Sequence, residues 1–301
     1  MTLNELRYIV ALADERNFRR AAERVFVSQP ALSLAVAKLE DELGVSLFER
    51  GRNDVTPTPI GARVVDQARR VLLEAGRVKD IAVDGRDDLK GAVRLGVIYT
   101  IGPWLIPALV PELQKVAPGM PLALEENLTS ELTERLKDGR IDVAILAAPF
   151  DVPGLSTLPL YEEDFVVVVP KGHPFLRRKT IDPDMLKGEP LLRLGEGHCF
   201  ADQVAAACPG SDESARTLEG NSLETIRNMV ASGLGITVLP RSAAMGAYPQ
   251  GLLGVVPFST PVPSRRVLMA WRESWPREGA RAALAQAVRD CGLAGVSRLQ
   301  V

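Results

Sequence analysis

Short apolar runs and helix-favouring runs alternate through the middle of the chain, and this alternation restricts the possible folds more than any other feature. Val93–Ile98, Leu122–Glu126 and Val143–Ala147 are predicted strands, and helices are expected between them at 102–116 and 130–137. Strands that alternate with helices form parallel β-α-β units, in which the helices cover the faces of a sheet. The sequence therefore predicts an α/β domain in this region.

The pattern continues into a second half of this domain. Asp164–Pro170 contains four consecutive valines, which is typical of a strand buried on both faces. Asn221 and Glu224 have the spacing of a capping box for a helix that ends at Ala231. Further strands are expected at 236–239 and 267–271, and a last helix at 279–290.

The N-terminal region has the pattern of three short helices. Apolar residues recur at helical spacing from Leu3 to Ala13, and Asn17 is a suitable N-cap for a second helix. Ser28 would cap a third helix, which Gly44 would end. Two helices joined by a short turn are typical of a helix-turn-helix, whose second helix enters the DNA major groove.

The third helix begins with the side chains that we expect to contact DNA. Gln29 can pair with an adenine edge and Ser33 can bond bases or phosphates, while Pro30 and Leu34 face away from the apolar stripe of the helix. A predicted hairpin wing would bring its arginines to phosphates or to a narrow minor groove. The alternative is a generic helical domain with a solvated arginine loop. The expected DNA-binding residues are Ser28, Gln29, Pro30, Ser33, Leu34, Arg50 and Arg52.

A long helical segment follows the wing. Small apolar residues recur at alternating spacings of four and three from Val64 to Ala82, which is the pattern of a helix that pairs with a second helix. The alternative is that this helix packs against its own domain. The polar run Asp84–Asp88 indicates a flexible hinge. We therefore divide the chain into 1–58 (DNA-binding domain), 59–90 (linker helix and hinge) and 91–301 (regulatory domain, with lobe I at about 91–162 and 267–301 and lobe II at about 163–266).

Two of the three cysteines lie nine positions apart. Cys199 precedes a helix-favouring run that reaches Cys208, and the positive end of that helix would favour a thiolate at Cys199. A rise of about 1.5 Å per residue would separate the two Cα atoms by roughly 13 Å. A disulfide needs about 4.4–6.8 Å, so the bond forms only if the helix unfolds. The alternative is two small buried hydrophobic residues that never meet.

Composition excludes several classes of protein. The chain is 46% hydrophobic and 25% charged, as in globular proteins, and it contains no run of about 18 apolar residues. Without a visible secretory signal, a cytoplasmic location is expected, where a disulfide would be transient. The two histidines lack metal-ligand spacing and no phosphate-binding glycine motif is present, so no metal or cofactor is expected. The net charge of −2 means that DNA binding would rest on a few placed cations.

Several collinear motifs resemble the LysR-type transcriptional regulators. The N-terminal matches are Ala21-Ala22, Val27–Ser33, Leu39-Glu40, Leu43-Gly44, Leu47–Arg50 and Thr58–Gly61. The later part resembles the regulatory domain of this family. The resemblance implies an N-terminal winged helix-turn-helix with a long linker helix, followed by an α/β two-lobed regulatory domain like a periplasmic binding protein.

The segments Gly195–Cys199, Asp202-Gln203 and Cys208 resemble the cysteine segment of the peroxide-sensing branch of this family. The resemblance implies that Cys199 attacks hydrogen peroxide and that Cys208 resolves the sulfenic acid to a reversible disulfide. Thr100 and Thr129 would hydrogen-bond the peroxide; they are otherwise helix-capping hydroxyls. His198, Asp202 and Arg266 would tune the thiolate, with Arg266 preferred over Arg265 by the family pattern.

The implied protein is an activator of oxidative-stress genes. Its implied partners are double-stranded promoter DNA, hydrogen peroxide, RNA polymerase and further copies of the chain in a dimer or tetramer, with no membrane. Two other functions stay open. One is a regulator of the same architecture that binds a small organic effector in the cleft between the lobes. The other is a thiol peroxidase, against which the helix-turn-helix argues.

Overall fold

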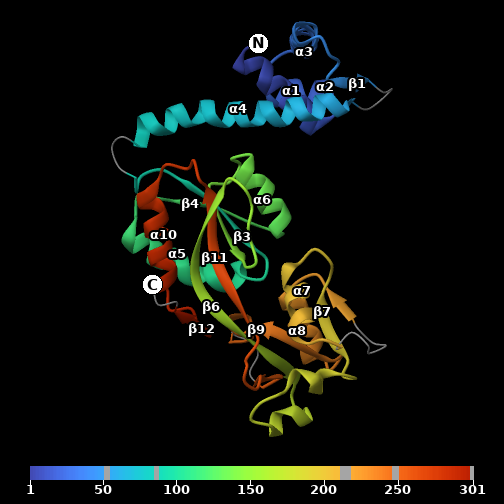
Figure 1. Cartoon of the computed structure of the whole chain (residues 1–301), viewed down its shortest axis with the longest axis vertical. Coiled ribbons are helices and arrows are strands. Elements are labelled where there is room, and N and C mark those ends of the chain that lie inside the picture. Colours follow the sequence, from blue (N-terminus) through green and yellow to red (C-terminus); the bar gives the residue numbers. More distant parts are fainter. Residues whose placement is uncertain (51–54, 85–87, 211–217, 246–250, 299–301) are drawn as a thin grey trace. The chain divides into compact units, whose positions relative to one another are not determined.

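A computed structural model of the chain describes residues 1–50, 55–84, 88–210, 218–245 and 251–298 (Figure 1). The chain divides into two compact units, residues 1–86 and 87–301. None of the described helices is both long enough and apolar enough to cross a membrane.

The first unit contains the expected helix-turn-helix and a short antiparallel hairpin. The Asn17 side chain accepts hydrogen bonds from the backbone N–H groups of Arg19 and Arg20, and Ser28 accepts one from Ala31. Gly44 ends the third helix in the left-handed conformation, so these predicted caps are confirmed. The elements are α1 (Leu3–Glu15), α2 (Phe18–Arg24), α3 (Gln29–Leu43), β1 (Phe48–Arg50), β2 (Val55–Pro57) and α4 (Pro59–Asp84).

Helix α4 is tied to the hairpin at its first turn. The Thr58 hydroxyl donates to the carbonyl of Ser46 and accepts from the backbone N–H of Gly61. A Cβ at Gly61 would lie 1.9 Å from the Leu47 carbonyl oxygen, so only glycine permits this approach. Val65 and Ala68 are buried in the core of the unit, whereas Val78 is 67% exposed. The first half of α4 therefore packs on its own unit, whereas Val78 in its second half is exposed.

The second unit is built on the predicted β-α-β pattern. Strand β3 (Val93–Ile98) pairs in parallel with β4 (Leu122–Asn127) and β5 (Val143–Ala147), joined by α5 (Gly102–Val116) and α6 (Thr129–Lys137). Two long antiparallel strands continue the sheet, β11 (Ser264–Arg272) beside β5 and β6 (Leu155–Pro170) beside β11. Helix α10 (Glu278–Asp290) completes this lobe, whose buried core includes Leu95, Leu109, Ile145, Val267 and Leu284.

The second lobe has its own core, and β6 runs through both lobes (Figure 1). Its strands follow the order β6, β9, β7, β8, with β10 also paired to β6. The buried residues include Phe165, Val167, Leu192 and Phe200. The elements are β7 (Leu191–Leu194), α7 (Cys199–Ala207), β8 (Leu218–Gly220), α8 (Leu223–Ala231), β9 (Ile236–Pro240), α9 (Arg241–Met245) and β10 (Leu253–Pro257). Strand β12 (Val296–Arg298) pairs with the middle of β6, at Tyr161–Glu163.

Two sequence predictions were wrong in detail. Strand β6 begins at Leu155 and not at Asp164, because residues on both sides of Asp164 pair with neighbouring strands. Helix α8 is capped by Ser222 and not by Asn221, since the Ser222 hydroxyl accepts from the backbone N–H of Thr225. Local sequence patterns do not show which strands will pair across a sheet. They also do not distinguish between two adjacent residues that could each act as the N-cap.

The predicted hinge Asp84–Asp88 includes 85–87, which lie outside the described residues. Its last residue is anchored to the first lobe. The Asp88 carboxylate accepts a hydrogen bond from the backbone N–H of Gly279 at the start of α10. The Arg277 guanidinium donates to the backbone carbonyls of Asp88, Lys90, Gly91 and Ala92. Residues 88–92 are thus fixed to the first lobe by Arg277 and the start of α10.

Candidate functional site

Cys199 is the first residue of α7 and lies where the two lobes meet. Helix α7 contributes Phe200 and Val204 to the core of the second lobe, but Cys199 packs against the core of the first. The loop before it needs a glycine, because Gly197 has a φ of +89° and a Cβ there would lie 3.2 Å from the Leu128 side chain. The thiol is therefore held between lobes by a tight local turn.

A small cavity adjoins this thiol. It offers about 10 Å³ to the centre of a water-sized molecule, which is close to the space one water needs. The His198 ring stands edge-on to the Tyr99 ring, with 5.9 Å between ring centres, and burial lowers the pKa of His198, which favours its neutral form. The lining residues are Ile98, Tyr99, Thr100, Asn127, Leu128, Thr129, Gly197, His198 and Cys199.

Two threonine hydroxyls in this lining have different environments. The buried Thr100 hydroxyl accepts a hydrogen bond from Arg265 Nη1 at 2.9 Å. The Thr129 hydroxyl oxygen is buried and has no hydrogen-bond partner among the described residues. Neither threonine is an N-cap, since Ile101 and Leu128 occupy the N-cap positions of α5 and α6. Thr129 therefore offers an unused donor and acceptor beside Cys199.

Arg265, and not the favoured Arg266, contacts the cavity residues. Its guanidinium donates to the Thr100 hydroxyl and carbonyl and forms a buried ion pair with Glu163, Nη2 to Oε2 at 2.7 Å. It also lies 5.4 Å from the centre of the Phe200 ring. The side chain of Arg266 is 52% exposed and pairs with Glu162. The alternation of side chains along β11 explains why neighbouring arginines lie in such different environments.

Two polar residues of α7 lie in different environments: Asp202 is exposed, and Gln203 contacts the first lobe. Asp202 is exposed in the first turn and is outside the cavity lining. Gln203, which the sequence analysis named as part of the cysteine segment but gave no role, donates from Nε2 to the Ala148 carbonyl at 2.9 Å and so ties α7 to the first lobe. This hydrogen bond to the first lobe could not be predicted from local sequence, because it depends on the side of α7 on which Gln203 lies. Helix α7 is thus fastened to both lobes.

Cys208 closes α7 and is buried, 1% exposed, in the core of the second lobe. Residues 199–207 are helical and all three cysteines carry thiols. The helical rise of about 1.5 Å per residue keeps the Cα atoms of Cys199 and Cys208 roughly 13 Å apart. A disulfide between them therefore requires α7 to unfold.

The stability of the protein is expected to fall as the pH rises from about 9 to about 11, partly through Cys208. Burial raises the pKa of its thiol from near 9 to about 11, and the positive charge of Arg193 partly opposes this shift. In that window the native protein holds a proton that the unfolded chain has lost, so unfolding becomes more favourable with pH. Urea unfolding across this range should show a smaller fall for Cys208→Ala. Equal falls in both proteins would contradict the assignment.

The residues expected to contact DNA lie at the start of α3. Ser28, Gln29 and Pro30 are exposed, Ser33 is half-buried and Leu34 is 73% exposed. Arg50 lies in β1, while Arg52 lies outside the described residues. The exposed first turns of α3 match the part of a helix-turn-helix that enters the major groove.

Comparisons with known proteins agree with this arrangement. Residues 3–62 match the family described as bacterial regulatory helix-turn-helix protein, lysR family, and residues 86–292 match the LysR substrate binding domain. The chain belongs to the LysR family of bacterial transcriptional regulators. It is 38% identical over 292 residues to the hydrogen peroxide-inducible genes activator of Dickeya chrysanthemi, covering 96% of this chain and 95% of that protein.

Solved structures extend the similarity to the full length. A full-length OxyR variant from Pseudomonas aeruginosa is 50% identical with a TM-score of 0.80, and the match covers 98% of this chain and 99% of that one. A hydrogen-peroxide-bound OxyR variant from Corynebacterium glutamicum is 32% identical with a TM-score of 0.65, covering 96% and 92%. Both relatives carry the name OxyR.

Proposed function

We propose that this protein is a hydrogen-peroxide-sensing transcriptional regulator that uses Cys199 and Cys208 as a reversible switch. The observation that carries the proposal is the cavity beside Cys199, whose lining includes the unpartnered hydroxyl of Thr129. Peroxide is hardly larger than water and both of its oxygens donate and accept hydrogen bonds. The Thr129 and Thr100 hydroxyls would orient it toward the sulfur, with His198 as a neutral neighbour.

The chemistry proceeds in two steps. The Cys199 thiolate attacks one peroxide oxygen, the O–O bond breaks, and the leaving hydroxide takes up a proton to form water. This produces a sulfenic acid at Cys199. Once α7 unfolds, the Cys208 sulfur attacks the sulfenic sulfur and a second water leaves, so that two thiols and one peroxide become one disulfide and two waters.

The same unfolding would carry the signal. Cys199 and Gln203 attach α7 to the first lobe, while Phe200 and Val204 attach it to the second. Loss of the helix therefore removes contacts with both lobes at once, which is a two-state change that oxidation drives. We propose that it alters how two or four copies of this chain assemble, with the exposed side of α4 at the interface.

The proposed function also implies a cellular location, a set of DNA contacts and a partner in transcription. The protein would act in the cytoplasm, bind double-stranded promoter DNA through Ser28, Gln29, Pro30, Ser33, Leu34, Arg50 and Arg52, and activate transcription by RNA polymerase. Asp202 and Arg266 keep their proposed role of tuning or ordering the Cys199 thiolate, although the Asp202 side chain is exposed and Arg266 pairs with Glu162 at the surface. No cofactor is part of the proposal.

The test is a thiol count by mass after treatment with nearly stoichiometric peroxide. Wild type is expected to lose two of its three thiols, Cys208→Ser one, and Cys199→Ser none. Cys291→Ser is the control: it should still lose both remaining thiols, because the Cys291 thiol donates to the Val288 carbonyl within its own helical turn. Three intact thiols in treated wild type would exclude the redox switch.

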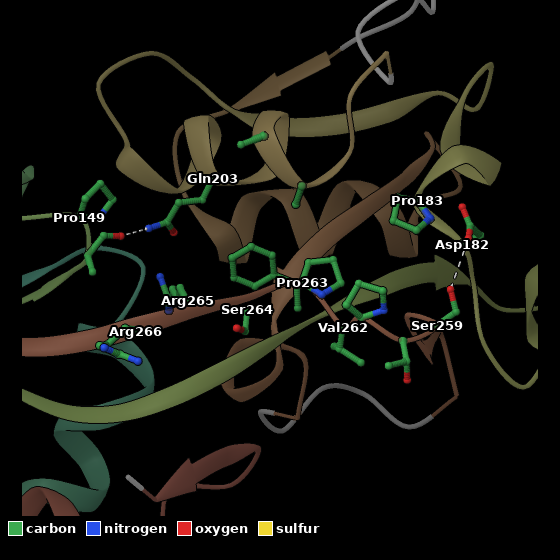
Figure 2. A pocket seen from close by; sticks show the side chains of 16 residues that line it. Pro149, Asp182, Pro183, Gln203, Ser259, Val262, Pro263, Ser264, Arg265 and Arg266 are labelled. Carbon is green, nitrogen blue, oxygen red and sulfur yellow. Dashed lines mark hydrogen bonds between the residues drawn. The ribbon is translucent and has the colours of Figure 1, made fainter. Parts of the chain in front are cut away.

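A second candidate function is supported by a separate groove of about 710 Å³ beside α7 (Figure 2). Pro149, Pro183 and Pro263 line it together with Gln203, whose buried Oε1 has no hydrogen-bond partner among the described residues. A volume of this size accommodates a small organic effector with an apolar body and one donor group. In that case Cys199→Ser would keep its response to the inducer, whereas the peroxide switch requires that the response is lost.

A further inference from the structure

Phe26 lies in the turn between α2 and α3. Its backbone conformation is unfavourable for a bulky residue, and its ring gains almost no packing within the described part of this unit. Its backbone is left-handed, with a φ of +57°, and its ring is 95% exposed. A bulky residue rarely adopts this conformation, which suits glycine or asparagine. Hydrogen bonds from Phe26 N–H to the Glu23 carbonyl and from Val27 N–H to the Ala22 carbonyl hold the turn. The ring is thus presented to solvent by a well-defined turn.

Further apolar side chains are exposed on the helix that follows. Pro30 and Leu34 are one helical turn apart and share a face of α3, and Leu34 is 73% exposed. Ala31 is exposed beside them. We call Phe26, Pro30 and Leu34 the apolar contact set. It adjoins Ser28 and Gln29, so it continues the surface through which a helix-turn-helix meets DNA.

Two arginines of this unit, Arg19 and Arg24, are paired with carboxylates and contribute less to phosphate binding than free cations would. Arg19 pairs with Glu23 at 3.0 Å, and Arg24 pairs with Asp14 at 3.0 Å and with Glu15 at 3.2 Å. Neutralised arginines give weaker attraction to the phosphate backbone, which supplies most of the sequence-independent affinity. For Arg19 and Arg24 this lowers the contribution to phosphate contacts, and it raises the relative weight of contacts with base edges.

We propose that the apolar contact set reads thymine in the major groove. The only apolar group that base edges present there is the C5-methyl of thymine, and aromatic and aliphatic side chains bind it by excluding water. The proposal rests on the proposed DNA-binding function and adds to it a class of sequence: operators with thymines at the positions beneath Phe26 and Leu34. A hydrogen-bonding side chain at these positions would instead favour bases that present a hydrogen-bond donor or acceptor in the major groove.

The experiment uses the full chain and a duplex that the protein itself selects from a random library. Each thymine is replaced in turn by uracil, which removes only the methyl group, and binding is measured by fluorescence anisotropy at one salt concentration. Loss of one buried methyl is expected to weaken wild-type binding by about fourfold at one or two positions of each half-site. Phe26→Asn or Leu34→Ala should weaken binding to the thymine duplex and reduce the effect of uracil to less than about 1.5-fold at the matching position.

Two controls keep the result interpretable. Asparagine tolerates the left-handed backbone, so Phe26→Asn is expected to unfold at the wild-type temperature or above it. Leu43→Ala removes a 39% exposed leucine at the other end of α3 and should retain both affinity and uracil sensitivity. Equal uracil effects in wild type, Phe26→Asn and Leu34→Ala, or specific binding that no uracil weakens, would overturn the proposal. Failure to select any specific duplex would instead refute the DNA-binding function on which it rests.

Discussion

Thr129→Val is expected to slow the oxidation of Cys199 by peroxide by about tenfold or more without destabilising the protein. The buried Thr129 hydroxyl has no hydrogen-bond partner among the described residues, so its replacement by a methyl group removes an unsatisfied polar group. The same change removes a donor from the cavity in which peroxide would be oriented. As the O–O bond breaks, negative charge develops on the leaving oxygen of the peroxide. A hydrogen bond to a charged group contributes about 1.5–3 kcal/mol, which corresponds to a rate change of roughly ten- to a hundredfold.

The measurement is the pseudo-first-order rate of thiol loss in Cys208→Ser, in which oxidation stops at Cys199, with and without Thr129→Val. Thr133→Val is the matched control. Its hydroxyl lies one turn further along α6 and donates to the Thr129 carbonyl at 2.7 Å. This control should lose stability, because the bond is lost, but should react with peroxide at nearly the wild-type rate. An unchanged rate in Thr129→Val would remove Thr129 from the peroxide site.

Replacement of one member of the Arg265–Glu163 pair is expected to have the largest effect on stability. Both side chains are almost fully buried, at 1% and 0% exposure, and the Nη2–Oε2 distance is 2.7 Å. Arg265→Met would leave the Glu163 carboxylate buried without its cation, at a cost of about 3–5 kcal/mol in the free energy of unfolding. Glu163→Met would leave the guanidinium in the same position. The double variant should be more stable than either single variant, because no buried charge remains.

Urea unfolding of the four proteins measures this coupling. Arg266→Met is the control, since this exposed neighbour pairs with Glu162 at the surface and should change stability by less than about 1 kcal/mol. Arg265→Met also removes the donor to Thr100, so slower oxidation of Cys199 is expected in the same variant. Additive losses in the double variant would show that the two charges do not stabilise each other.

Local patterns were sufficient where the physical cause is local. The caps Asn17, Ser28 and Gly44 and the predicted strand Val93–Ile98 agree with the structure. Each depends on hydrogen bonds or spacings within a few residues. The start of β6 at Leu155 was missed because it depends on pairing with β11, which is distant in the sequence.

The site was also predictable only in part, because some of its residues depend on contacts between segments that are distant in the sequence. The resemblance pointed to Thr100, Thr129 and His198, and the structure places all three around the cavity beside Cys199. It favoured Arg266, whereas the guanidinium in contact with Thr100 belongs to Arg265. Which of two adjacent arginines on a strand turns inward depends on the register of that strand in the sheet. That register is set by β5 and β6, far away in the chain.

The sequence alone determined that Cys199 and Cys208 are separated by a helix, because the rise of a helix is a property of consecutive residues. It also determined a helix-turn-helix with defined caps. Only the tertiary structure decided that Cys199 packs against the lobe to which its own helix does not belong, beside the unpartnered hydroxyl of Thr129. The reason is physical: these neighbours come from β-α turns of another lobe, and their approach depends on how two separate cores pack.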